Sequence, residues 1–157
     1  FYEEGKSIKL INSSVSGDTT GGGLGRLAKN LKKFNPDFVL IELGGNDALR
    51  GYSINLIKSN LEKMIALAKQ NKSKVLLMQI RIPPNYGQKY THAFEKIYVD
   101  LAQTEEVYLL PFMLEKIGIT SELMQPDGIH PNKKAQPLIA KEMKKNIDKF
   151  LLFNQSN

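Results

Sequence analysis

Apolar residues along the chain fall into short continuous runs that are separated by segments of helical spacing. The runs Phe38–Leu43, Lys74–Ile80 and Val107–Leu110 predict buried strands of a parallel sheet. In Lys6–Val15, polar residues separate the apolar ones, which predicts a further strand near the start of the chain. The pattern therefore predicts a sheet of several strands, each followed by other structure.

Apolar residues at helical spacing follow these strands. Ser53 and Asn132 stand where N-terminal caps of two helices are expected. Pro137 lies in the early turns of the last helix, which conflicts mildly with that prediction. The predicted helices cover residues 24–31, 53–68, 94–102, a short segment at 112–117, and 132–150.

Strands that alternate with helices predict a single α/β domain over residues 1–157, with helices on both faces of a parallel sheet. No internal repeat, linker or low-complexity segment divides the chain. Ligands bind outside the carboxyl ends of the strands in such sheets. The loops expected together at that rim are 16–18, 44–47, 81–87 and 127–130.

Composition narrows the class of protein. Of the 157 residues, 41% are hydrophobic and 24% are charged, which is typical of a globular core. The formal net charge of +6 allows an anionic partner, but no run of five like charges exists, which disfavours nucleic-acid binding. The chain has no cysteine, which excludes disulfides and thiol chemistry, and no apolar run is long enough for a membrane span.

The segment Gln125–Asn132 holds an acid and an imidazole three positions apart. Asp127 and Gly128 form a turn dipeptide, and Pro131 favours an extended conformation at His130. In such a turn the carboxylate of Asp127 accepts a hydrogen bond from Nδ1 of His130, which leaves Nε2 open as a base. The alternative is a surface loop with an incidental histidine.

Two glycine-containing loops are candidates for stabilising an oxyanion. In Gly44–Asp47, glycines let the backbone approach a ligand and Asn46 offers a neutral amide donor. Asp47 is expected to orient this loop, through Arg50. Gly17, after the first predicted strand, can offer its backbone N–H to the same oxyanion. A plain turn remains the alternative at both places.

Other motifs carry less information. Gly21–Gly25 lacks the Lys-Ser/Thr of a phosphate loop and lies too far from a strand for a dinucleotide fingerprint, so it is interpreted as a flexible loop before a helix. His92 is expected at the surface, and two histidines without a carboxylate cluster argue against a metal site. Tyr86 and Tyr90 either line a substrate groove or stiffen a loop.

The chain has no convincing nucleophile. Ser13, Ser14 and Ser16 lie at the end of the first predicted strand, but none is in a G-x-S-x-G elbow. The segments Ser16–Thr19, Leu43–Asp47 and Asp127–Pro131 nevertheless resemble, in order and spacing, the second, third and fifth blocks of the SGNH (GDSL) hydrolases. The resemblance is closest to the bacterial thioesterase and lysophospholipase members of that family.

This resemblance implies a flavodoxin-like, three-layer α/β/α fold. It implies that Asp127 and His130 belong to a catalytic triad, with Gly17 and Asn46 as oxyanion donors. It also implies a mobile loop over the acyl site at 48–52, which contains Leu49, and an acyl groove lined by Ile82. Acyl transfer of this kind needs no cofactor.

The family's first block, which carries the nucleophilic serine and a central strand, is missing from this sequence. By the family pattern it precedes Phe1, and residues 1–157 alone are expected to be inactive. The resemblance implies a serine esterase or thioesterase that acts on small acyl esters or thioesters, monomeric and periplasmic or secreted. The alternatives are a nucleophile-less relic or acyl-binding module, and a carbohydrate acetylesterase of the same superfamily.

Overall fold

The computed structural model describes residues 8–115, 117–118 and 120–155, which divide into two units. The larger unit is Ser16–Phe112. The smaller unit combines the residues before Ser16 with those from Met113 onward. The prediction of a single domain over 1–157 stays a prediction.

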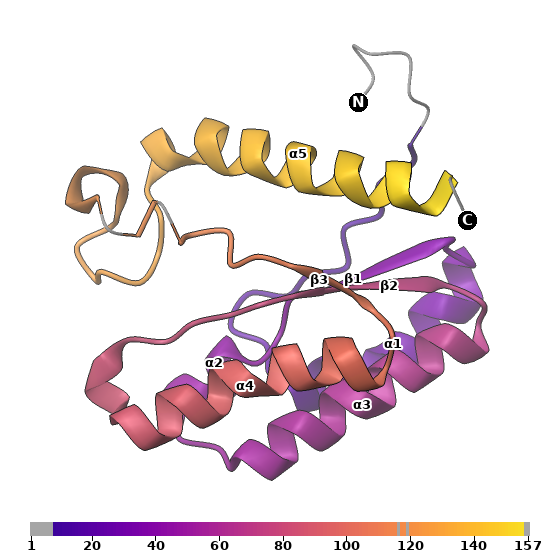
Figure 1. Cartoon of the computed structure of the whole chain (residues 1–157), viewed down its shortest axis with the longest axis horizontal. Helices are drawn as coiled ribbons and strands as arrows, with labels where there is room; N and C mark the ends of the chain where they lie inside the picture. The colour runs from indigo at the N-terminus through magenta and orange to yellow at the C-terminus, as the bar shows by residue number, and fades with distance from the viewer. Residues whose placement is uncertain (1–7, 116, 119, 156–157) are drawn as a thin grey trace. The chain divides into compact units, whose positions relative to one another are not determined.

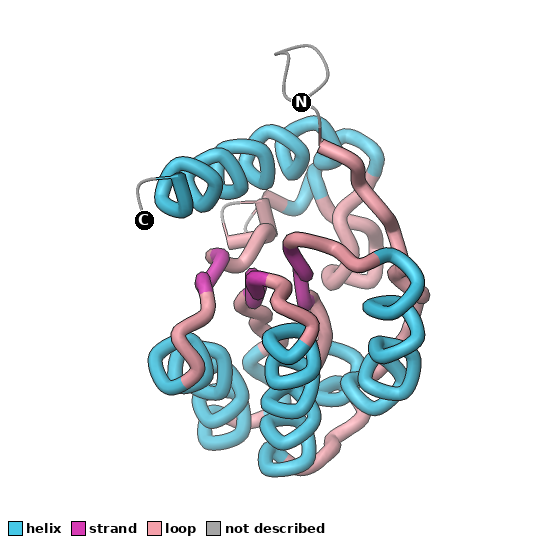
Figure 2. The backbone as a smooth tube through the Cα atoms, turned by 90° about the vertical axis from the view of Figure 1, so that its right-hand side faces the viewer, coloured by secondary structure: helices cyan, strands magenta, loops and turns pink. Residues whose placement is uncertain are grey.

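The larger unit is built on a parallel sheet, as predicted (Figure 1, Figure 2). Its strands are β1 (Phe38–Ile41), β2 (Lys74–Met78) and β3 (Tyr108–Leu110), in the order β1-β2-β3. Phe38 pairs with Lys74, and Leu76 of β2 pairs with Tyr108. Because each connection moves one strand in the same direction, right-handed crossovers place the connecting helices on the same face of the sheet.

Three long helices pack beside this sheet: α1 (Thr20–Phe34), α3 (Ile54–Gln70) and α4 (Gln88–Thr104) (Figure 1). Helix α1 packs against α3, and both α3 and α4 pack against β2. Two short helices, α2 (Gly45–Leu49) and the 3-10 helix η2 (Pro84–Tyr86), follow β1 and β2 respectively. Both lie just after the carboxyl end of a strand, where the sequence predicts the site.

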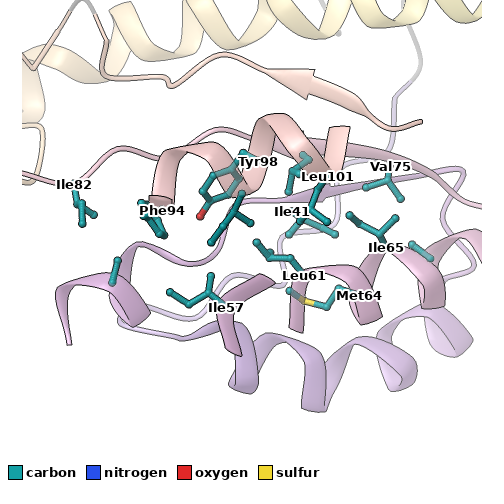
Figure 3. Packing of buried hydrophobic residues seen from close by; sticks show 14 residues of the cluster. Ile41, Ile57, Leu61, Met64, Ile65, Val75, Ile82, Phe94, Tyr98 and Leu101 are labelled. Atoms are coloured by element: carbon teal, nitrogen blue, oxygen red, sulfur yellow. The ribbon is translucent and has the colours of Figure 1, made fainter. Parts of the chain in front are cut away.

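One hydrophobic cluster lies between the sheet and α3 and α4 (Figure 3). Phe94 and Tyr98 meet edge to face in it, with ring centroids 5.4 Å apart. Such burial contributes about 25 cal/mol per Å² of apolar surface removed from water. The cluster consists of Ile41, Ala48, Ile57, Leu61, Met64, Ile65, Ala68, Val75, Leu77, Ile82, Phe94, Ile97, Tyr98 and Leu101.

Strand β1 is less buried than its apolar run predicts. Ile41 faces the cluster, but Phe38 and Leu40 on the other face are 40% and 42% exposed. Among the described residues β1 pairs with β2 alone, so it is an edge strand of this sheet. An unbroken apolar run shows that two faces are suited to burial and does not show that the structure covers both.

Two predicted elements are absent from the described residues. The strand predicted at Lys6–Val15 is wrong over residues 8–15, which have no regular structure, and Leu10 is 88% exposed. Residues 6–7 lie outside the described part. A strand needs a hydrogen-bonding neighbour, and none pairs with this segment. The short helix predicted at 112–117 is also wrong, because residues 113–115 form turns; Lys116 lies outside the described residues.

The interpretation of Gly21–Gly25 as a flexible loop is wrong, because α1 begins at Thr20 and includes these glycines. The Thr19 hydroxyl accepts a hydrogen bond from Gly22 N–H at 3.3 Å and caps the helix. A Cβ atom at Gly23 would lie 2.2 Å from Cδ1 of Leu43. The glycine therefore allows α1 to approach the segment after β1 closely, which outweighs its low helix propensity.

The smaller unit holds the 3-10 helices η3 (Ser121–Leu123) and η4 (Lys133–Ala135) and the helix α5 (Gln136–Gln155). The predicted cap Asn132 accepts a hydrogen bond from Lys134 N–H at 2.9 Å. Pro137 conflicts little with the helix, because it lies in the first turn of α5, where a backbone N–H has no helical partner. Within the described part of the chain, no helix has both the length and the apolar character needed to cross a membrane.

Candidate active site

Asp127 and His130 form the side-chain pair that the sequence predicts. Nδ1 of His130 lies 2.7 Å from Oδ2 of Asp127. The other oxygen, Oδ1, accepts hydrogen bonds from the N–H groups of Ile129 at 2.9 Å and His130 at 3.0 Å. The carboxylate therefore fixes both the imidazole and the backbone that carries it. In the neutral tautomer whose Nδ1–H donates to this carboxylate, Nε2 is an acceptor.

A short antiparallel pairing of the flanking residues supports this loop. Met124 and Pro131 form a β-bridge, and Gln125 N–H donates to His130 O at 2.8 Å. The amide of Asn132 donates to the carbonyls of Glu122 and Met124. Gly128 has a φ of 65°, which a glycine adopts without strain and which closes the turn between acid and imidazole. The His130 side chain remains 67% exposed and therefore accessible to solvent.

The hydrogen bonds from the backbone and side chain of His130, together with the Ile129 N–H, lower the pKa of Asp127 from 3.8 to about 2. All three stabilise the ionised carboxylate. The contribution of the ionised Asp127 carboxylate to the stability of the folded state is fully present above pH 3.8. It is lost as pH falls through the folded pKa of about 2. Asp127 therefore stays ionised across the range in which an imidazole titrates.

We expect the Asp127 carboxyl carbon to titrate near pH 2 when its ¹³C chemical shift is followed by NMR. The variant His130→Ala, which removes the side-chain hydrogen bond, is expected to raise this pKa toward 3.8. Asp100, a partly exposed acid on α4, serves as the internal reference in the same spectra. Equal titration of Asp127 in the wild type and in His130→Ala would contradict the pairing.

Asn46 lies in the first turn of α2, a helix that the sequence analysis did not predict. Gly44 caps α2 with a φ of 119°, and a Cβ atom there would lie 2.3 Å from Oη of Tyr98. The Tyr98 hydroxyl donates to Leu43 O at 2.9 Å, and its pKa is raised by burial and by the charge of Asp47, so it stays protonated. The position of Asn46 therefore depends on a buried tyrosine in α4.

The prediction that Asp47 orients its loop through Arg50 is wrong about the partner. Asp47 is 1% exposed and accepts hydrogen bonds from Thr20, at the start of α1. Arg50 instead donates from Nη2 to Gly17 O at 3.0 Å, and from its N–H to Asn46 O at 3.3 Å. A single residue thus contacts both predicted oxyanion donors.

The two predicted donors have N–H groups that are open. Within the described residues, neither the Gly17 N–H nor the Asn46 side-chain amide makes a hydrogen bond to the protein. Gly17 has a φ of 73°, which favours glycine. An unpaired N–H beside an exposed loop is available to a ligand oxygen.

The residues predicted to bind substrate lie after β1 and β2. The Tyr86 hydroxyl donates to Leu49 O at 3.2 Å, so η2 and the end of α2 are in contact. The Tyr90 hydroxyl donates to Tyr52 O at 2.6 Å and ties α4 to the same segment. Ile82 is buried at 7% exposure in the hydrophobic cluster, against which Leu49 packs. The two tyrosines therefore hold Leu49 and Tyr52, which belong to the segment 48–52 that the resemblance describes as a mobile loop over the acyl site.

His92 is exposed on α4, as predicted. Among the described residues no group of three or more histidines and acids is suited to hold a metal ion. Thr20, Asn60 and Tyr98 are polar residues that support the site and were not predicted from the sequence. Only the burial of Tyr98 could have been predicted from the sequence, because Tyr98 lies four residues after Phe94 on the apolar face of a predicted helix.

A parallel α/β sheet and, in the other unit, an Asp–His pair are both features of hydrolases that work by nucleophilic acyl transfer. Comparison with known proteins gives the same class. The chain belongs to the GDSL-like lipase/acylhydrolase family, whose model matches residues 3–137. It is therefore a member of an ester hydrolase family, as the sequence analysis predicts.

Two curated relatives are similar over most of the chain. An arylesterase of Vibrio mimicus is 49% identical over 95% of this chain and 74% of its own length. Thioesterase 1/protease 1/lysophospholipase L1 of Escherichia coli K12 is 46% identical over 88% of this chain and 66% of its own length. The chain thus spans about two thirds to three quarters of these relatives.

Solved structures confirm the predicted fold class, a flavodoxin-like α/β fold with a parallel sheet. The psychrotrophic esterase EstA from a Pseudoalteromonas species, inhibited by monoethylphosphonate, superposes with a TM-score of 0.93. It is 42% identical and covers 96% of this chain and 82% of its own. TesA superposes with a TM-score of 0.88 at 42% identity, over 93% of this chain and 81% of its own.

The structure thus brings together Asp127 with His130 in the smaller unit. In the larger unit it connects Gly17 with Asn46 through Arg50, and Leu49 with Tyr86. That His130 meets the two oxyanion donors stays a prediction from the sheet topology.

Proposed function

We propose that the full-length gene product is a serine esterase or thioesterase that uses a Ser-His-Asp triad. Asp127 and His130 supply two members, and the serine belongs to a segment that precedes Phe1. The observation that carries this proposal is the 2.7 Å contact between Nδ1 of His130 and Oδ2 of Asp127, which leaves Nε2 as an open acceptor. The relatives are longer than this chain, which is consistent with a further segment in the full-length product.

In the proposed mechanism, Nε2 of His130 takes the proton of the serine hydroxyl as its oxygen attacks the acyl carbon. Asp127 stabilises the imidazolium that forms. The Gly17 N–H and the Asn46 amide donate to the tetrahedral oxyanion. His130 then returns the proton to the leaving alcohol or thiol, and a water activated by His130 releases the acid.

The proposed substrates are small acyl esters or thioesters, without a cofactor. The relatives named arylesterase and thioesterase/lysophospholipase support this range. Leu49, Ile82 and Tyr86 are proposed to bind the acyl chain, because they lie just after β1 and β2. We further propose a monomer that is periplasmic or secreted, as the resemblance to bacterial members of the family implies.

A phosphonate that carries a leaving group tests the proposed nucleophile. A p-nitrophenyl alkylphosphonate should inactivate the full-length product as the serine oxygen displaces p-nitrophenolate and forms a P–O bond. Mass spectrometry is expected to place the adduct on a serine before Phe1. An adduct on Ser14 or Ser16, or full activity of a chain that starts at Phe1, would refute the proposed location.

Substrate profiling separates the alternatives. The same protein is expected to hydrolyse p-nitrophenyl acyl esters and acyl-CoA in preference to acetylated sugars. A preference for acetylated sugars would favour a carbohydrate acetylesterase. Binding of these acyl compounds without turnover would favour an acyl-binding module.

A further inference from the structure

A buried polar cluster joins the two loops that carry the proposed oxyanion donors. It consists of Thr20 at the start of α1, Asp47 in α2 and Asn60 in α3, which are 0%, 1% and 9% exposed. None of these residues is part of the proposed triad or oxyanion hole. Buried polar groups need a structural or functional reason, because each must be fully hydrogen-bonded to be tolerated.

Both carboxylate oxygens of Asp47 accept hydrogen bonds from the same residue, Thr20. The Thr20 N–H donates to Oδ2 at 2.8 Å, and the Thr20 hydroxyl donates to Oδ1 at 2.5 Å. The amide of Asn60 then donates to Oγ1 of Thr20 at 3.0 Å. A hydroxyl can donate one hydrogen bond and accept another, so Oγ1 of Thr20 donates to Asp47 and accepts from Asn60.

The cluster lies directly beside the proposed donors in the sequence. Asp47 follows Asn46, and Thr20 is three residues after Gly17. A second link comes from Arg50, which donates to Gly17 O and Asn46 O. The segments 17–20 and 46–50 are therefore joined twice, once by a buried pair and once by a surface arginine.

We propose that Asp47 and Thr20 are positioning residues that hold Gly17 and Asn46 as one preorganised oxyanion hole. The inference rests on the function proposed above. An oxyanion hole works only if its donors are in place before charge develops. A misplacement of about 1 Å lowers the rate by about 10²-fold, so a link between α1 and α2 has a direct effect on turnover.

The geometry also explains why the link is an acid and a threonine. The Thr20 N–H belongs to the first turn of α1, where N–H groups lack a helical partner and the helix end favours negative charge. A carboxylate satisfies that N–H and the hydroxyl at once. An asparagine in its place has one acceptor oxygen and would turn an NH₂ group toward one of two donors.

The test uses three variants of the full-length product and a matched control. Asp47→Asn is expected to lower kcat about 30- to 100-fold and Thr20→Val about tenfold, with KM changed less than threefold. Thr20→Ser, which keeps the hydroxyl, should stay within threefold of the wild type. Asp100→Asn removes a partly exposed acid of the same unit, which pairs with Lys96, and should leave kcat unchanged.

Three measurements separate positioning from loss of folded protein. The end-point amount of p-nitrophenolate released by the alkylphosphonate counts active sites, and kcat is expressed per site. The rate constant of phosphonylation should fall in the same proportion as kcat/KM, because that reaction also develops negative charge on oxygen. Thermal unfolding shows whether each variant is folded at the assay temperature.

Each outcome decides the inference. Site-corrected kcat within threefold of the wild type in both Asp47→Asn and Thr20→Val overturns it, whatever the change in stability. A change in KM alone also overturns it, as does failure of Thr20→Ser to restore turnover. If His130→Ala abolishes turnover and these variants do not reduce it, only the positioning role fails. If His130→Ala is fully active, the proposed function itself fails.

Discussion

Replacing His130 by alanine in the full-length product is expected to lower kcat for p-nitrophenyl acyl esters by about 10⁴-fold or more. The loss is large because the imidazole serves as base for the attack and as acid for the leaving group. The side chain is 67% exposed and the 2.7 Å contact with Asp127 is its one hydrogen bond to another described side chain. The substitution should therefore leave the fold intact.

His92 provides the matched control, because it is the other histidine of the chain and is exposed on α4. His92→Ala should stay within about twofold of the wild type, in line with the small effects of surface substitutions. Initial rates measured at several substrate concentrations give kcat and KM separately for both variants. Retention of more than a tenth of the wild-type kcat in His130→Ala would exclude His130 as the general base.

The sequence predicted this pair because its geometry is local. Asp127 and His130 lie three residues apart, and the turn residues Gly128 and Pro131 restrict the backbone between them. The strands β2 and β3 were predicted for a related reason, since their apolar runs match the buried interior of a parallel sheet. Features set by a few neighbouring residues can be read from one sequence.

Features that depend on distant neighbours could not be read in this way. The segment 8–15 has a strand-like pattern, but a strand forms only beside a partner. Gly21–Gly25 looked like a loop until the cap at Thr19 and the close approach to Leu43 were known. The partner of Asp47 is Thr20, 27 positions earlier, and no local pattern pointed to it.

Replacing Asn46 by alanine is expected to lower kcat by about 10²- to 10³-fold, which corresponds to about 3–4 kcal/mol of transition-state stabilisation. Its amide makes no hydrogen bond to the described part of the protein, so the ground state loses little when the amide is removed. Stability should therefore change by no more than about 0.5 kcal/mol in urea unfolding. KM should change little, because a neutral ester carbonyl gains less from the donor than the oxyanion does.

The contrast between charge and shape makes the Asn46 prediction specific. Asn46→Asp has nearly the same shape, but it places an acceptor where the oxyanion needs a donor, so its kcat should be at least as low as that of Asn46→Ala. Asn55→Ala, at an exposed position of α3, should retain wild-type turnover. If Asn46→Asp were more active than Asn46→Ala, the side chain would act through its shape or its acceptor oxygen, and the oxyanion would have to be stabilised by other donors.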